Sequence, residues 1–257
     1  MQAVILAAGY GKRLKKVSAG LPKPMVRLKG KPILEYVIEV LPEVIDEVII
    51  VVGYKKEVIK EYFGDYYDGR VIRYAEQPEP KGTADALYQA EPLLRDEEFL
   101  CLYGDNFYSR MDILNCIHRT PTILVRESKT PERYGVCLVS EKNELIATLE
   151  KRENPPSNLV AIGVQLLNKE FFDVPKVQLP SGEYNLTEQI GLWAKRQPVQ
   201  VIRAAFWQPV DYPENIPARV RLAKLANTKL KQFLKEEERY TEHRPDVENE
   251  ESDLEAS

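Results

Sequence analysis

Short apolar runs alternate with amphipathic segments through the first 105 residues, and this alternation constrains the fold more than any other feature of the sequence. The apolar runs predict buried strands at 3–7, 47–53, 70–76 and 97–105. The amphipathic segments predict helices at 32–41, 55–63 and 83–90. Pro32 suits a first helical turn, Gly64 closes the second helix, and Thr83 is the expected cap of the third. Strands that alternate with helices predict an α/β fold, in which a parallel sheet carries helices on both faces.

The second half of the chain has a different pattern. Closely spaced strand candidates follow one another, with few helices between them, at 121–127, 134–140, 144–150 and 158–167. We expect these strands to extend the sheet in an antiparallel or mixed manner. Further patterns predict a helix at 185–196, a strand at 199–211 and a long helix at 213–235. Since no repeat and no clean linker interrupts them, we predict one continuous domain over 1–235.

Charge is distributed unevenly along the chain. The formal net charge of the 257 residues is −4, but residues 235–257 contain ten acidic and three basic side chains, which leaves a mildly basic body. An acidic tail of this composition is typical of disorder, so we expect 236–257 to be disordered and assign it no chemistry. No apolar stretch approaches the roughly 18 residues that span a bilayer, and no basic leader precedes the first strand. We expect a cytoplasmic protein, with neither a membrane nor a nucleic acid as its partner.

Cysteine and histidine are too few and too scattered for several kinds of site. The three cysteines are Cys101, Cys116 and Cys137, and an odd number of widely spaced thiols is a poor disulfide framework. Cys101 and Cys137 stand inside apolar runs, which is typical of small core residues. His118 and His243 have no ligand-like spacing to a cysteine. A zinc site or a Ser-His-Asp triad is therefore hard to build from this sequence.

Functional residues are expected where strands end, because ligands of open α/β sheets bind beyond the carboxyl ends of the strands. After the first predicted strand, VILAAGYGKRLKKVSAGLPKP at 4–24 turns from apolar residues to glycine and positive charge. Leu14 stands where a dinucleotide fingerprint needs its third glycine, and the Gly-Lys-Ser/Thr of a P-loop is missing. Two interpretations remain. One is a solvated basic loop; the other is a glycine turn at Gly9 and Gly11 whose cations, Arg13 and Lys23, bind phosphate.

The segment EQPEPKGTADAL at 76–87 follows the third predicted strand. Its prolines stiffen the loop, and Gly82 removes a side chain just before a helix. The amide of Gln77 both donates and accepts hydrogen bonds, so it is suited to reading the edge of a nucleobase. The alternative is a plain connection between a strand and a helix.

Charged side chains mark three further strand ends. Asp105 in YGDN and Asp211 in FWQPVDYPEN are candidate ligands of Mg²⁺, which one or two carboxylates hold together with substrate phosphates. Either aspartate is also compatible with an ordinary turn or helix cap. Glu150 and Lys151 in LEKRENPPSNLVAIGV pair a carboxylate, which accepts from hydroxyls, with an ammonium, which binds phosphate. That pair suits a sugar phosphate, and the alternative is a surface ion pair.

Several of these segments occur together in the order of one enzyme family. They are LAAGYGKR at 6–13, PK at 22–23, Gln77 with Gly82 and Ala84, GDN at 104–106, and EK at 150–151 followed by SNL at 157–159 and Gly163. In this combination the chain resembles the sugar-1-phosphate nucleotidyltransferase family, which includes glucose-1-phosphate thymidylyltransferases and uridylyltransferases. The resemblance covers roughly residues 1–235.

The resemblance implies a Rossmann-like, three-layer nucleotidyltransferase fold of the GT-A type, with a mostly parallel mixed sheet. It also implies transfer of a nucleotidyl group from a nucleoside triphosphate to a sugar 1-phosphate, with Mg²⁺ as the cofactor. UTP or dTTP and glucose 1-phosphate are the favoured substrates, and a homo-oligomer is possible. Two alternatives remain: a cytidylyltransferase for phosphocholine or inositol phosphate, and a non-catalytic paralogue that binds an NDP-sugar.

The resemblance also assigns roles to residues. The residues implied for nucleotide binding are Leu6, Ala8, Gly9, Gly11, Lys12, Arg13, Lys23, Gln77 and Gly82. The sugar phosphate pocket would be lined by Asn106, Gly135, Glu150 and Lys151. The implied catalytic residues are Arg13, Lys23 and Asp105, and the implied Mg²⁺ ligands are Asp105 and Asp211.

The sequence departs from the family pattern at two places. Lys12 stands where the family usually has threonine or serine, so a long cation replaces a hydroxyl that bonds phosphate. Around Asp211 the family often shows D-x-G-T-P-E, whereas this chain has the shorter DYPEN. These departures keep the non-catalytic alternative open.

Overall fold

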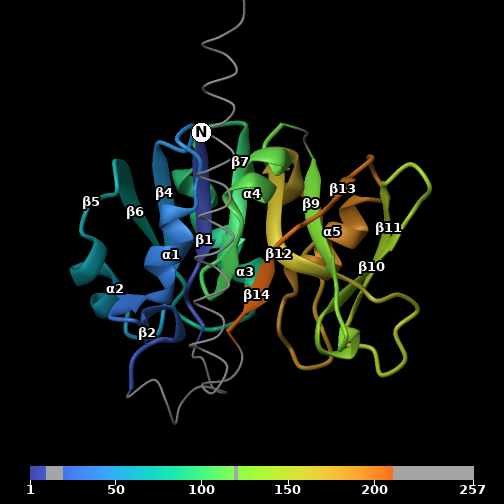
Figure 1. Ribbon diagram of the computed structural model, residues 1–257, viewed down its shortest axis with the longest axis horizontal. Coiled ribbons are helices and arrows are strands. Elements are labelled where there is room, and N and C mark those ends of the chain that lie inside the picture. The colour runs from blue at the N-terminus through green and yellow to red at the C-terminus, as the bar shows by residue number, and fades with distance from the viewer. Residues whose placement is uncertain (10–19, 119–120, 211–257) are drawn as a thin grey trace, which may run out of the picture.

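The computed structural model describes residues 1–9, 20–118 and 121–210 (Figure 1). Through this described part runs one ten-stranded sheet, with helices packed on both of its faces. The helix predicted at 213–235 and the tail at 236–257 lie outside the described residues. The division into a domain and a disordered tail therefore stays a prediction.

Four parallel strands form one half of the sheet, in the order β7-β1-β4-β6. The strands are β1 (Gln2–Leu6), β4 (Glu47–Val52), β6 (Arg70–Glu76) and β7 (Glu98–Tyr103). The helices between them are α1 (Ile33–Glu39), α2 (Lys56–Phe63) and α3 (Thr83–Ala90). Strand β4 is buried at every position, as expected for a strand covered on both faces. The predicted alternation is confirmed, with ends that differ by at most two residues.

The other half of the sheet is built around β12 (Leu159–Asn168), which pairs antiparallel with β7. Strand β12 also pairs antiparallel with β9 (Thr122–Glu127) and β10 (Gly135–Val139). Strand β11 (Leu145–Glu150) pairs antiparallel with β10, and β13 (Gln200–Arg203) pairs parallel with β9. The short β5 (Tyr66–Tyr67) adds an antiparallel edge beside β6. Except for β5, β11 and β12, the strands of this described sheet run in one direction. The predicted mixed, mostly parallel sheet is confirmed.

The strand predicted at 199–211 is wrong in its extent. The chain breaks after β13 and forms β14 (Trp207–Pro209), which pairs with β8 (Asn106–Tyr108) in a separate two-stranded sheet. Asp112 causes the break, because its two carboxylate oxygens accept hydrogen bonds from the backbone nitrogens of Ala205 and Phe206, each at 2.9 Å. These contacts direct β14 toward β8, whose first residue, Asn106, follows Asp105.

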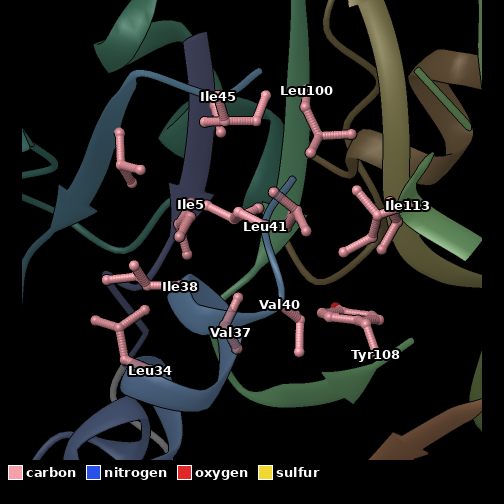
Figure 2. Packing of buried hydrophobic residues seen from close by; sticks show 14 of the residues in the cluster. Ile5, Leu34, Val37, Ile38, Val40, Leu41, Ile45, Leu100, Tyr108 and Ile113 are labelled. Atoms are coloured by element: carbon pink, nitrogen blue, oxygen red, sulfur yellow. The ribbon is translucent and has the colours of Figure 1, made fainter. Parts of the chain in front are cut away.

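The core fills both faces of the main sheet, which gives three layers. Figure 2 shows one face, where Ile5 of β1 and Leu100 of β7 pack toward α1 and Ile113 of α4 (Arg110–Cys116). Neighbouring strand residues point to the opposite face, which α3 and α5 (Leu186–Trp193) cover. The thiols are free and buried, as predicted for Cys101 and Cys137, and the third is Cys116.

Short elements complete the described fold. A second two-stranded sheet joins β2 (Arg27–Leu28) and β3 (Lys31–Pro32). The 3-10 helices are η2 (Lys23–Met25), η3 (Glu91–Leu93), η4 (Pro131–Arg133) and η5 (Lys169–Asp173).

Candidate active site

A cavity of about 510 Å³ opens at the carboxyl end of the parallel strands. Every predicted site residue that the structure describes lines it: Leu6, Ala8, Gly9, Lys23, Gln77, Gly82, Asp105, Asn106, Gly135, Glu150 and Lys151. The other predicted site residues, Gly11, Lys12, Arg13 and Asp211, lie outside the described residues. Segments that are far apart in the sequence therefore meet at one edge of the sheet.

An ion pair joins two of these segments. Lys23 begins η2, and Asp105 lies in the turn between β7 and β8. The Nζ of Lys23 is 2.7 Å from the Oδ2 of Asp105. Gly104 holds this turn close to β1, since its backbone nitrogen donates to the carbonyl oxygen of Leu6 at 3.0 Å. The pair places one cation and one carboxylate together on the cavity wall.

Gly82 begins the helix that Thr83 was predicted to cap, so that prediction is wrong. Gly82 is the N-cap of α3, with φ +104° and ψ 178°, and a Cβ on it would lie 2.3 Å from the carbonyl oxygen of Tyr184. Only glycine fits both the backbone conformation and the space. The hydroxyl of Thr83 instead accepts from the backbone nitrogen of Leu186 at 3.0 Å, which ties α3 to the start of α5.

The amide of Gln77 is fixed within the same loop. Gln77 is 5% exposed, and its Nε2 donates to the carbonyl oxygen of Gly82 at 3.1 Å and to Oδ2 of Asp85 at 2.9 Å. Both amide hydrogens are used by these bonds. The carbonyl Oε1 is then the hydrogen-bonding atom left for a ligand.

Glu150 lies in the part of the cavity wall that β10 and β11 form. Gly135 of β10 is paired with Glu150 of β11, and a Cβ on Gly135 would lie 2.8 Å from Oε2 of Glu150 and 2.6 Å from Cγ2 of Thr187. Oε1 of Glu150 lies 3.2 Å from Nζ of Lys151. The Glu150 side chain is 10% exposed and that of Lys151 is 50% exposed. The carboxylate is thus recessed in the cavity, with an ammonium at its rim.

The cavity also has an aromatic lining that the sequence did not predict, namely Tyr103, Tyr134, Tyr184 and Trp207. The ring of Tyr103 lies against Gly163, where a Cβ would come within 2.4 Å of a ring carbon. Burial raises the pKa of Tyr103 well above its usual value, so its hydroxyl stays protonated. The position of Tyr103 directly before GDN was a usable signal. Trp207 offered none, because the predicted strand at 199–211 concealed the break before it.

Asp105 is the predicted Mg²⁺ ligand that falls within the described residues. Across 1–9, 20–118 and 121–210, no group of three or more His, Cys, Asp or Glu side chains is arranged to hold a metal. A single carboxylate is nevertheless compatible with Mg²⁺, which completes its coordination with phosphate oxygens and water. Pro209 pairs with Asn106, so the chain leading to Asp211 passes beside the residue after Asp105. The use of Mg²⁺ stays a prediction.

Comparison with known families decides the class of the protein. A family model described as Nucleotidyl transferase matches residues 2–210, which include the whole lining of the cavity. The chain belongs to this nucleotidyl transferase family. The predicted family and the predicted enzyme class are confirmed.

Two relatives show how far the similarity extends. The chain is 37% identical over 228 residues to the UTP–glucose-1-phosphate uridylyltransferase AglF of Haloferax volcanii, which covers 84% of this chain and 93% of that protein. It is 35% identical over 240 residues to the Bifunctional protein GlmU of Methanocaldococcus jannaschii. That alignment covers 92% of this chain but 58% of the relative, so the chain spans little more than half of the relative's length.

A solved structure confirms the predicted fold. The structure described as UDP-glucose pyrophosphorylase complexed with UDP-glucose has a TM-score of 0.73 and 22% identity, over 90% of this chain and 98% of that one. Among the described residues, no helix has both the length and the apolar character needed to cross a membrane. The cytoplasmic location and the homo-oligomer stay predictions.

Proposed function

We propose that this nucleotidyl transferase moves a uridylyl or thymidylyl group from UTP or dTTP to a sugar 1-phosphate, with glucose 1-phosphate as the favoured acceptor. The proposal rests on one observation: three groups of different chemistry line the same cavity. The fixed amide of Gln77 suits a nucleobase, and the pair of Lys23 and Asp105 suits the charged phosphates. The recessed Glu150 beside Lys151 suits the hydroxyls and phosphate of a sugar phosphate.

The relatives support the choice of substrates. AglF of Haloferax volcanii is named a UTP–glucose-1-phosphate uridylyltransferase, and its alignment with this chain covers 93% of its length. A relative matched over nearly its whole length is a better guide to the substrate than one matched over half. We therefore favour UTP with glucose 1-phosphate over the other pairs.

The reaction is a displacement at the α-phosphorus. A phosphate oxygen of the sugar 1-phosphate forms the new bond to the α-phosphorus, the bond to the oxygen of the β-phosphate breaks, and pyrophosphate leaves with the electron pair. The second pKa of a phosphate monoester is about 6, so the nucleophile is already ionised near neutral pH and needs no general base. The site must instead hold two anions that repel each other. Lys23 meets that need as a point charge for phosphate, and Arg13 is the second predicted cation.

Asp105 supports the proposal that the reaction depends on magnesium. When bound, Mg²⁺ neutralises charge on the phosphates and orients them. Asp105 provides a hard carboxylate oxygen of the kind this ion prefers, and Asp211 is the other predicted ligand. Tyr103 and Tyr134 line the same cavity with partly exposed rings.

The decisive experiment crosses the common nucleoside triphosphates with a panel of sugar 1-phosphates, phosphocholine and inositol phosphate. Pyrophosphate release is followed with Mg²⁺ and with EDTA. We expect the highest kcat/KM for UTP or dTTP with glucose 1-phosphate, and no release in EDTA. Release only from CTP with phosphocholine or inositol phosphate would establish the cytidylyltransferase alternative. If no pair releases pyrophosphate, the protein is a non-catalytic member of the family and the proposal is wrong.

A further inference from the structure

The orientation of the Gln77 amide depends on one buried carboxylate. Oδ2 of Asp85 accepts from Nε2 of Gln77 at 2.9 Å, and the Asp85 residue is 8% exposed. An ionised carboxylate is an acceptor only, so it bonds the NH₂ end of the amide and not the carbonyl end. The carbonyl oxygen of Gly82, also an acceptor, takes the second hydrogen at 3.1 Å. Two acceptors thus hold the amide in one of its two orientations.

Asp85 is itself held from the opposite side. Nζ of Lys176 lies 3.3 Å from Oδ1 of Asp85, so the two carboxylate oxygens serve two different partners. The same ammonium lies 4.8 Å from the ring centroid of Tyr88 and 4.8 Å from that of Tyr184. Two aromatic faces restrict where the ammonium can lie. These contacts link Lys176, in the segment between η5 and α5, through Asp85 to Gln77 in the cavity wall.

We infer that Asp85, supported by Lys176, is a positioning residue that sets the base specificity of the site. The inference rests on the proposed function, in which the base lies against Gln77. With its amide hydrogens engaged, Gln77 presents the carbonyl Oε1 and so favours a base that offers an N–H. Uracil and thymine carry a hydrogen on ring nitrogen N3, whereas N3 of cytosine is an acceptor and is left facing another acceptor. The network selects UTP and dTTP against CTP.

Asparagine at position 85 tests this directly. Its side chain has almost the shape of aspartate, but it can donate as well as accept. In Asp85→Asn the new NH₂ group can bond Oε1 of Gln77, so the carbonyl oxygen of Gly82 is the one acceptor that still holds the original orientation. The Gln77 amide therefore turns more readily and presents its own NH₂ to the base. Cytosine then gains a partner for N3, and uracil loses one.

The experiment measures kcat/KM for UTP and for CTP with glucose 1-phosphate, in the full-length wild type and in Asp85→Asn. We expect the UTP-to-CTP ratio to fall by about tenfold or more, the scale on which unpaired polar groups discriminate substrates. Lys176→Met should shift the ratio in the same direction by less, because Asp85 keeps its carboxylate. Glu79→Gln is the matched control, since it removes one exposed charge from the same loop and should leave the ratio unchanged. A general loss of folding or of catalysis would lower both rates without changing their ratio.

The outcomes separate this inference from the function on which it rests. An active Asp85→Asn enzyme with the wild-type ratio would overturn the positioning role while leaving the proposed function intact. If Asp85→Asn does not fold, Lys176→Met decides, and an unchanged ratio in that variant also overturns the inference. A wild type that releases no pyrophosphate from any pair overturns the proposed function, and the inference with it.

Discussion

The ammonium of Lys23 lies 2.7 Å from the carboxylate of Asp105, although the two residues come from distant parts of the chain. The side chains are 17% and 31% exposed, respectively, so solvent screens the pair. Exposed ion pairs contribute only about 0–1 kcal/mol to folding, and this partly screened pair belongs near that range. In the proposed reaction, the ammonium of Lys23 binds phosphate and the carboxylate of Asp105 binds Mg²⁺. Substitution of either residue should therefore separate activity from stability.

Asp105→Asn should abolish Mg²⁺-dependent pyrophosphate release while leaving the fold intact. A neutral amide is a weak ligand for a hard cation, and the lost ion pair costs at most about 1 kcal/mol. Steady-state pyrophosphate release measures the first effect, and thermal unfolding measures the second. Glu132→Gln, which removes a carboxylate beside the cavity residue Arg133, is the control and should keep wild-type turnover. Normal turnover in Asp105→Asn would show that the metal assignment is wrong.

Lys23→Ala should lower kcat/KM by about 10²–10³, or about 3–4 kcal/mol of transition-state stabilisation, because one fixed donor to the phosphates is lost. Initial rates at varied triphosphate and sugar phosphate measure the change. Lys142→Ala, which removes an exposed lysine from the turn between β10 and β11, should leave kcat/KM unchanged. Unchanged kinetics in Lys23→Ala would remove Lys23 from the site.

Local patterns were sufficient to predict the alternating elements of the first half. They also predicted the strand ends that place Gln77 and Asp105 in one cavity, because the alternation of strands and helices is recorded at short range along the sequence. Features that depend on distant contacts were not predictable. Asp112 breaks the last strand from across the fold, and Tyr184 makes Gly82 the cap in place of Thr83. No pattern within one segment records which other segment will lie against it.

Gly82→Ala should destabilise the protein more than Gly69→Ala. Both glycines have positive φ, +104° and +78°, but only at Gly82 would a Cβ meet another atom, 2.3 Å away on Tyr184. Gly69→Ala should cost about 1–2 kcal/mol, the penalty for a left-handed L-residue. Gly82→Ala adds a clash with the backbone and moves Tyr184, so it should also raise KM for the triphosphate. Urea unfolding of the two variants gives the difference, and equal free energies of unfolding would contradict the clash.

The buried thiols should be unreactive in the native protein. Burial raises the pKa of Cys101, Cys116 and Cys137 to about 12, so almost no thiolate is present at neutral pH. Ellman's reagent should label the native chain only at the rate of unfolding, and it should label three thiols at once in guanidinium chloride. Ser181→Cys, at an exposed position, is the control and should add one rapidly labelled thiol. Rapid native labelling without that substitution would show that β7, β10 or α4 opens readily.

Glu76 should make the stability of the protein depend on acid pH. Hydrogen bonds from Lys56, then Lys60, lower the pKa of Glu76 from 4.5 to about 2. Because the folded pKa is the lower one, the stabilisation is present above pH 4.5 and is lost as the pH falls toward 2. The Glu76 side chain is 43% exposed, so Glu76→Gln should cost no more than about 1 kcal/mol at pH 7. Urea unfolding at pH 7 and pH 2.5 should show that the difference in unfolding free energy between wild type and Glu76→Gln shrinks in acid. Glu61→Gln, at an exposed position on the helix α2 that carries both lysines, should show no such change. A difference of equal size at both pH values would mean that the two lysines do not hold the carboxylate in solution.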